Sequence, residues 1–269
     1  MIGPNAAATL LEIRGVLVSK EVNVLSKRLV LIPCILLGAS ILLAQGWWES
    51  KLYTSWTKDE VTNMLDKSPW GTVYNRAVER ISGIGTSITT GGGLGSTETA
   101  YDKLAFHLSF VTAKPIRMAL ARRALLVDPG NASKTDWGKY IDQDDPQNIV
   151  VVMSLTASPA DSAVALLLSQ TLDDFKLADL ASRTFLSTDG GKKVALAKYD
   201  SLGENGYGVK FYFPRTLPDG TPLVAAANKE IRFDTLLVLP KERSPETKSI
   251  AVNAKWDLKK MVLGGKPCF

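Results

Sequence analysis

Three stretches in the C-terminal half decide the fold class: YGVKFYF (207–213), IRFDTLL (231–237) and IAVNAKWDL (250–258). In each stretch, mostly apolar residues alternate with mostly polar or small ones. Successive side chains of a strand point to opposite faces of a sheet. The positions that share one face are Tyr207, Val209, Phe211 and Phe213, then Ile231, Phe233, Thr235 and Leu237, and finally Ile250, Val252, Ala254, Trp256 and Leu258. This pattern predicts an antiparallel sheet with one face in water.

Turn residues divide the same half of the chain at regular intervals. The turn signals are Asp189-Gly190-Gly191, Asn205-Gly206 and Pro218-Asp219-Gly220, which are typical of hairpins between strands. Further upstream, Leu104, Phe106, Leu108 and Phe110 alternate with smaller residues and predict another strand. The unbroken apolar run at 149–153 predicts a strand that is buried on both faces.

Helix signals all lie before residue 169, upstream of the regularly spaced turns. Thr57 and Glu60 match a capping box and predict a helix to about Lys67, and Pro115 predicts the start of a second helix to about Val127. Residues 128–147 look like a polar loop, and a third helix is expected from Ser158-Pro159 to Leu168. The fold class is therefore α+β, with a largely antiparallel, sandwich-like sheet, a β-rich C-terminal half and two or three helices in the domain.

An uncharged segment, LVLIPCILLGASILLA (29–44), precedes this domain. Lys27 and Arg28 lie on its N-terminal side, which is typical of a segment that directs export of the domain behind it. We interpret residues 29–48 as a signal peptide or an uncleaved membrane anchor; a buried core helix is the alternative. Residues 1–28 would be the leader's n-region, a misassigned start or a cytoplasmic tail. The soluble domain would be 49–269, exported to the periplasm or anchored facing it.

The segment SGIGTSITTGGGLGSTET (82–99) is rich in glycine, serine and threonine. It matches neither the dinucleotide-binding nor the P-loop pattern, because Ile88 stands where a glycine is needed and no Gly-Lys-Ser/Thr is present after it. We interpret it as a flexible loop within the domain.

Composition restricts the functions to consider. The first 44 residues contain four basic and two acidic residues, which leaves a net charge of +3 on residues 45–269 and gives no reason to expect a nucleic-acid partner. Cys34 lies in the apolar segment and Cys268 is the penultimate residue, so no framework of disulfides is expected. We also expect no cofactor.

Few residues are candidates for chemistry. His107 is the only histidine, so any histidine-based triad would have to include it, although a structural role on a strand is the simpler interpretation. Asp142, Asp144 and Asp145 are weak candidates for a metal site, but the EF-hand spacing fails because Pro146 and Met153 stand at ligand positions. Catalytic and cofactor-binding residues are therefore not assigned. The leading hypothesis is an envelope protein that binds a protein or small ligand through its β-rich half; the alternative is an extracytoplasmic hydrolase or transferase that uses these carboxylates.

Three segments give the chain a family resemblance. They are WTKDEV…SPW (56–70), AKPIRMALARR (113–123) and YFPRTLPDG…WDLKKMVLGGKPCF (212–269). In them the chain resembles uncharacterised exported proteins of acidobacterial type. The resemblance implies a bacterial, extracytoplasmic setting and transfers no activity, cofactor or binding residue.

Overall fold

The computed structural model describes residues 46–79, 101–132, 134–158, 162–201, 207–239 and 249–269. The chain forms two units, Met1–Lys51 and Leu52–Phe269. In the first unit only the end is described, where a short helix, α2 (Trp47–Ser50), stacks Trp47 edge-on against Trp48 with ring centroids 5.9 Å apart. The apolar segment 29–44 and the glycine-rich segment 82–99 lie outside the described residues.

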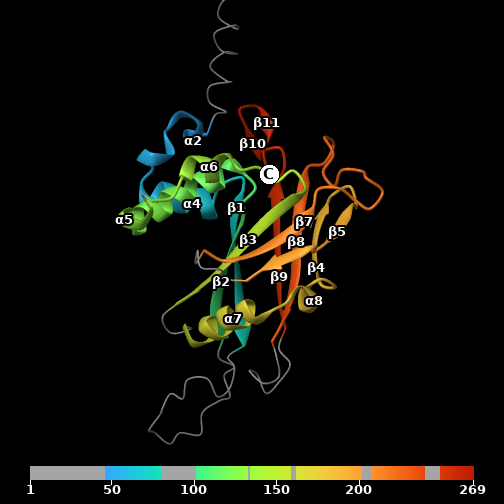
Figure 1. The fold of residues 1–269 in the computed structure, drawn as a ribbon. Helices are drawn as coiled ribbons and strands as arrows, with labels where there is room; N and C mark the ends of the chain where they lie inside the picture. Colours follow the sequence, from blue (N-terminus) through green and yellow to red (C-terminus); the bar gives the residue numbers. More distant parts are fainter. Residues whose placement is uncertain (1–45, 80–100, 133, 159–161, 202–206, 240–248) are drawn as a thin grey trace, which may run out of the picture. The chain divides into compact units, whose positions relative to one another are not determined.

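Two antiparallel sheets form the framework of the second unit (Figure 1). The five-stranded sheet has the order β1 (Gly71–Glu79), β2 (Tyr101–Phe110), β3 (Asn148–Ala157), β7 (Val209–Pro214) and β6 (Lys198–Asp200). The four-stranded sheet has the order β5 (Lys193–Ala195), β4 (Thr184–Thr188), β8 (Glu230–Val238) and β9 (Ser249–Asp257). A small hairpin of β10 (Val262–Leu263) and β11 (Lys266–Pro267) ends the chain. The predicted α+β class with largely antiparallel sheets is confirmed.

Aromatic rings join the inner faces of the two sheets. Phe110 of β2 meets Trp256 of β9 with ring centroids 4.6 Å apart, and Phe233 of β8 packs edge-on against both Phe211 and Phe213 of β7. All five side chains are buried. Burying two apolar faces against each other in this way is how a sandwich forms its core.

The alternation predicted for the strands is confirmed. The inward positions of β2, β8 and β9 are buried, namely Leu104, Phe106, Leu108 and Phe110, then Ile231, Phe233, Thr235 and Leu237, and finally Ile250, Val252, Ala254 and Trp256. Residues 149–153 of β3, the central strand of its sheet, are all buried, as the unbroken apolar run predicts. The prediction that residues 207–213 share one sheet with residues 231–237 and 250–258 is wrong, because β7 does not lie in the sheet of β8 and β9. β7 pairs instead with β3 and β6.

The chain passes between the sheets at β5 and β6. The backbone N–H of Leu196 still donates to Thr184 of β4, whereas that of Ala197 donates to Tyr212 of β7. Residues 193–200 therefore form one edge of both sheets in succession. At the other side of the sandwich, β1 and β9 are the outer strands and lie next to each other.

Helices cover the ends of this framework. The longer ones are α3 (Lys58–Asp66), α4 (Lys114–Val127) and α7 (Ser162–Asp174), and the shorter ones are α5 (Pro129–Ala132), α6 (Trp137–Asp142) and α8 (Leu177–Leu180). The capping box of α3 is confirmed: the N–H of Glu60 donates to Thr57 Oγ1 at 3.2 Å, and the N–H of Thr57 donates to Glu60 Oε2 at 2.7 Å. In Figure 1, α4, α5 and α6 gather at one end of the strands and α7 lies at the other.

The prediction of two or three helices was too low, because six α-helices occur in the described part of the second unit. Residues 128–147 contain α5 and α6 rather than only a polar loop. These segments have four and six residues, which is too few to show a helical period. Local contacts hold α6 instead: the Asp136 carboxylate accepts the N–H of Lys139 at 3.0 Å, and Trp137 packs edge-on against Tyr140.

Candidate functional site

The predicted carboxylates do not gather into one catalytic or metal centre. Asp142 is 70% exposed and accepts a hydrogen bond from Lys114 Nζ at 2.7 Å, which lowers the pKa of the Asp142 carboxyl group. Asp145 Oδ1 accepts the backbone N–H groups of Gln147 and Asn148 at 3.1 and 2.8 Å, so it shapes the turn before β3. Within the described ranges, no group of three or more His, Cys, Asp or Glu side chains could hold a metal ion.

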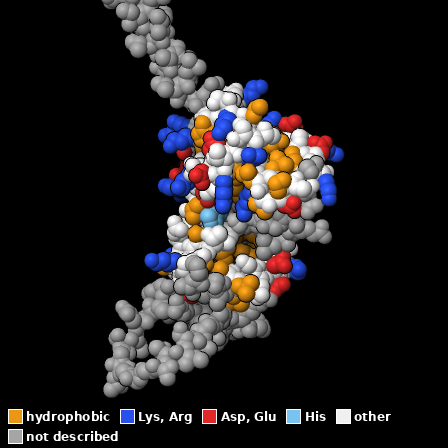
Figure 2. Space-filling view, turned by 90° about the vertical axis from the view of Figure 1, so that its left-hand side faces the viewer, with side chains coloured by type: hydrophobic (Ala, Val, Ile, Leu, Met, Phe, Trp, Pro, Cys, Tyr) orange, Lys and Arg blue, Asp and Glu red, His pale blue; other side chains and the backbone are white. Residues whose placement is uncertain are grey.

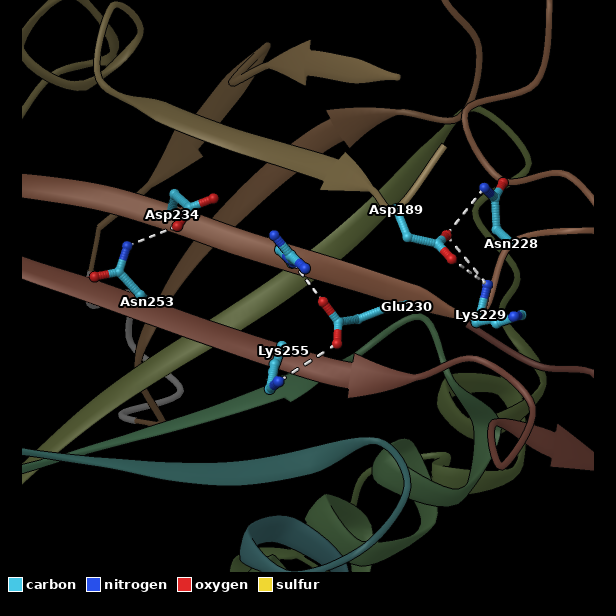
Figure 3. Close-up of polar contacts among 8 residues, drawn as sticks. Asp189, Asn228, Lys229, Glu230, Asp234, Asn253 and Lys255 are labelled. Carbon is cyan, nitrogen blue, oxygen red and sulfur yellow. Dashed lines mark hydrogen bonds and ion pairs between the residues drawn. The ribbon is translucent and has the colours of Figure 1, made fainter. Parts of the chain in front are cut away.

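The outer face of the four-stranded sheet is a network of paired polar side chains (Figure 3). Glu230 lies between Arg232 and Lys255, and Asp234 accepts a hydrogen bond from Asn253 Nδ2 at 2.6 Å. At the end of β4, Asp189 accepts the N–H of Lys229 at 3.1 Å. These carboxylates therefore stabilise neighbouring strands, and this surface is the face in water that the alternation predicted. A hollow of about 500 Å³ lies beside Glu230 and Lys255 on this surface.

The outer face of the five-stranded sheet has another hollow, which is lined by polar and aromatic side chains. Beside α6 lies an open hollow of about 490 Å³, which we call the α6 hollow. Its lining comes from the end of β2, from α4, α6, β3 and β7, and from the loop before β3: Val111, Thr112, Arg117, Tyr140, Gln143, Asp144, Asp145, Pro146, Gln147, Asn148, Val150, Lys210 and Tyr212.

Arg117 is the fixed cation of the α6 hollow. Its Nε donates to the carbonyl of Ile141 at 2.8 Å, and its NH1 donates to the carbonyls of Val111 and Thr112. The side chain is buried, and burial lowers the pKa of Arg117. A guanidinium remains charged under such a shift, so Arg117 joins α4, α6 and β2 and places a rigid donor group at the wall of the hollow.

Two tyrosines contribute aromatic surface to the α6 hollow. Tyr140 is held edge-on by Trp137 at a centroid distance of 5.7 Å, and Tyr212 donates its hydroxyl to Asp200 Oδ2 at 2.7 Å. Burial raises the pKa of both hydroxyls. Both phenols are therefore neutral at physiological pH, and their rings are held in place by contacts outside the hollow.

His107 lies on the same face of the sheet, between a carboxylate and a hydroxyl. Its Nδ1 is 2.9 Å from Asp66 Oδ1 at the end of α3, and its Nε2 is 2.8 Å from Thr156 Oγ1 on β3. A carboxylate only accepts, so Nδ1 carries the proton shared with Asp66; Nε2 accepts from the Thr156 hydroxyl in the tautomer in which Nε2 carries no proton. We call Asp66, His107 and Thr156 the histidine relay.

The histidine relay is open to solvent at its hydroxyl end. The His107 side chain is 21% exposed, Thr156 is exposed, and the histidine is visible at the surface in Figure 2. Nearby on this face, Tyr207 hydrogen-bonds Ser109, a neighbour of His107 on β2, and lies under the Arg123 guanidinium at 4.9 Å. Burial raises the pKa of Tyr207 to about 12, so this phenol also remains neutral.

The lone thiol of the described residues is Cys268, which is free and half-buried. Burial raises the pKa of Cys268 and outweighs the opposite effect of a hydrogen bond from the backbone of Lys114. The thiol is therefore held in its neutral, less reactive form.

Sequence reasoning identified His107 and the three aspartates but missed the partners that give them a role. Asp66 and Thr156 are 41 and 49 residues from His107 along the chain, and no local motif links them. Tyr140, Lys210 and Tyr212 were missed because their common hollow depends on the pairing of β3 with β7.

Comparisons with protein-family models, with curated proteins and with solved structures give no match for this chain.

Proposed function

We propose that the chain is an exported envelope protein whose folded domain binds a neutral, hydroxyl-rich ligand, such as an envelope glycan, in the α6 hollow. The lining of this hollow is the observation that carries the proposal. It contains two basic residues, Arg117 and Lys210, and two acidic residues, Asp144 and Asp145, so its formal charge is balanced. A strongly charged ligand would leave half of these groups without a favourable partner.

The other lining residues suit the same class of ligand. Gln143, Gln147 and Asn148 offer both donors and acceptors, as hydroxyl groups require, because a hydroxyl donates once and accepts twice. Tyr140 and Tyr212 add aromatic surface that stays neutral. A small number of oriented polar groups beside aromatic rings is the usual composition of a ligand site. Asp142 is paired with Lys114, and Asp145 Oδ1 is occupied by the backbone N–H groups of Gln147 and Asn148, which favours a binding role over carboxylate catalysis.

Binding should be measured by calorimetric titration of the full chain with a neutral oligosaccharide, chitotetraose, and with an acidic one of equal length, tetragalacturonate. We expect chitotetraose to bind and the acidic sugar to bind more weakly. Asp144→Ala and Lys210→Ala should each weaken chitotetraose binding about 3- to 10-fold, as expected for the loss of one hydrogen bond of about 0.5 to 1.5 kcal/mol.

Lys255→Ala is the matched control, because Lys255 is also an exposed charged residue but lies on β9, outside the α6 hollow. It should leave the affinity unchanged. Tighter binding of tetragalacturonate, or equal losses in Lys210→Ala and Lys255→Ala, would contradict the proposal.

The proposed location rests on residues 29–48, which would be a cleaved signal peptide or an anchor that contacts the membrane. Among the described residues, no helix is long and apolar enough to cross a membrane, and residues 29–44 lie outside them. Fusing residues 1–60 to alkaline phosphatase, which is active only outside the cytoplasm, should give activity in a bacterial host. Replacing Leu36 and Leu37 with arginine should abolish it, because charges in the apolar segment oppose insertion. Alkaline phosphatase activity that persists in this variant would contradict the export proposal.

A further inference from the structure

We propose that the histidine relay is a nucleophilic site, in which Thr156 accepts an acyl group from a small activated ester. The proposal goes beyond ligand binding in the α6 hollow. Thr156 lies six residues along β3 from Val150, which lines that hollow, and four from Val152, which pairs with Lys210 of the same hollow, so the two sites lie roughly 13 to 20 Å apart along the strand. They can therefore be tested separately.

The geometry of the relay satisfies the first requirement for an activated hydroxyl. A hydroxyl is a weak nucleophile unless a base within hydrogen-bond reach removes its proton, and the Thr156 Oγ1 to His107 Nε2 distance is 2.8 Å. A third group must orient the base, and the Asp66 carboxylate does so at 2.9 Å from Nδ1. A carboxylate, an imidazole and a hydroxyl thus form one continuous hydrogen-bonded chain.

The fold holds this chain in place from three separate elements. Asp66 is the last residue of α3, His107 lies on β2 and Thr156 on β3. The register pairs Ala105 with Thr156 and His107 with Ser154, which makes His107 and Thr156 diagonal neighbours on one face. Both nitrogens of His107 therefore have a partner: a carboxylate, which only accepts, at Nδ1 and a hydroxyl, which can donate or accept, at Nε2.

The reaction we propose has two steps, and water is the only co-reactant. In the first, Thr156 Oγ1 forms a bond to the ester carbonyl carbon while its proton passes to His107 Nε2; the bond to the alcohol breaks, and the alcohol leaves with that proton. In the second, water attacks the acyl-threonine, its proton passes through His107 to Thr156 Oγ1, and a carboxylic acid is released. Asp66 is a positioning residue, because it acts on the reaction only through His107.

The first test is covalent labelling of the full chain with an alkyl fluorophosphonate, followed by peptide mass spectrometry. We expect one adduct on Thr156, formed with loss of fluoride. His107→Gln should slow labelling about 100-fold or more, which is the lower end of the usual contribution of a general base. Thr156→Val should abolish it, and Thr156→Ser should retain it because the hydroxyl is kept.

Ser154→Ala is the matched control, since Ser154 lies opposite His107 on the same face and has a hydroxyl as well. It should label at the wild-type rate. The same series should show the same order in release of p-nitrophenol from p-nitrophenyl acetate. Urea unfolding of each variant separates a lost reaction from a lost fold. No adduct on Thr156, or an unchanged labelling rate in folded His107→Gln, would overturn the proposal.

The role of Asp66 has a readout of its own, because the chain contains a single histidine. In protein labelled with ¹⁵N-histidine, the two ring nitrogens give one pair of signals, whose shifts identify the protonated atom. We expect the proton on Nδ1 in the wild type and a shift of population toward Nε2 in Asp66→Asn, accompanied by slower labelling of Thr156. An unchanged tautomer in Asp66→Asn would contradict the positioning role.

Discussion

Replacing Trp256 with alanine is expected to lower the free energy of unfolding by about 3 to 5 kcal/mol, which is a large part of the stability of a typical domain. Trp256 is 4% exposed and packs edge-on against Phe110 of the other sheet. The substitution would leave a cavity between the two sheets at the edge where β9 lies next to β1. Urea unfolding of the full chain measures the loss.

Lys255→Ala is the control for Trp256→Ala, because Lys255 is the preceding residue on β9 and points to the opposite face. Its side chain is 73% exposed, and its Nζ lies 3.5 Å from Glu230 Oε2. Figure 3 marks this ion pair. The loss should be below about 0.5 kcal/mol, as for most surface sites. Equal losses in the two variants would show that the register of β9 is wrong.

Trp256→Phe separates packing from hydrogen bonding at the same position. Among the described residues, the buried indole Nε1 of Trp256 has no hydrogen-bond partner. Phenylalanine keeps an aromatic ring against Phe110 and removes this unpaired donor, so its cost should be well below that of alanine. A loss as large as that of Trp256→Ala would mean that the N–H group stabilises the fold.

Phe233→Ala is the second substitution with a large expected effect, again about 3 to 5 kcal/mol. Phe233 is fully buried and its ring lies 5.2 Å from that of Phe211 and 6.0 Å from that of Phe213. One side chain of the four-stranded sheet therefore packs against two of the five-stranded sheet. Both chemical denaturation and loss of near-ultraviolet circular dichroism should report the change.

Phe185→Ala is the matched control for Phe233→Ala, since it removes the same side chain from the adjacent strand. Phe185 lies on β4, is only half-buried, and contacts Lys193, whose Nζ is 3.5 Å from the ring centroid. An exposed contact of this kind contributes about 0.5 to 1 kcal/mol, so the loss should be far smaller than for Phe233. A comparable loss for Phe185 would contradict the face assignment of the four-stranded sheet.

The strands of this fold could be predicted from sequence because alternation is a local property. Residues 231–237 and 250–258 each reveal their buried face without reference to any other part of the chain. The assignment of strands to sheets could not be predicted in the same way. Phe211 and Phe233 are both inward-facing, but nothing in their own segments shows that they face each other from different sheets.

The candidate sites were less predictable than the fold, because each depends on non-local neighbours. His107 stands out in the sequence only as the single histidine, and its relay requires the end of α3 and the register between β2 and β3. Asp142 is a candidate for chemistry because it lies in an acidic segment. Its salt-bridge partner, Lys114, lies 28 residues earlier at the N-terminus of α4, so the local sequence does not reveal the pair. Side-chain identity is therefore informative only once the pairing of distant strands is known.

The position of β7 between β3 and β6 has a consequence for how the protein is made. Residue 149 pairs with residue 213, so one edge of β3 has no partner until a further 64 residues have left the ribosome. Pairing of strands so far apart along the chain is slow, because the intervening loop must close before any contact is gained. We expect the sandwich to form only after synthesis of the C-terminal strands, which leaves the nascent chain unfolded for as long as the proposed export would require.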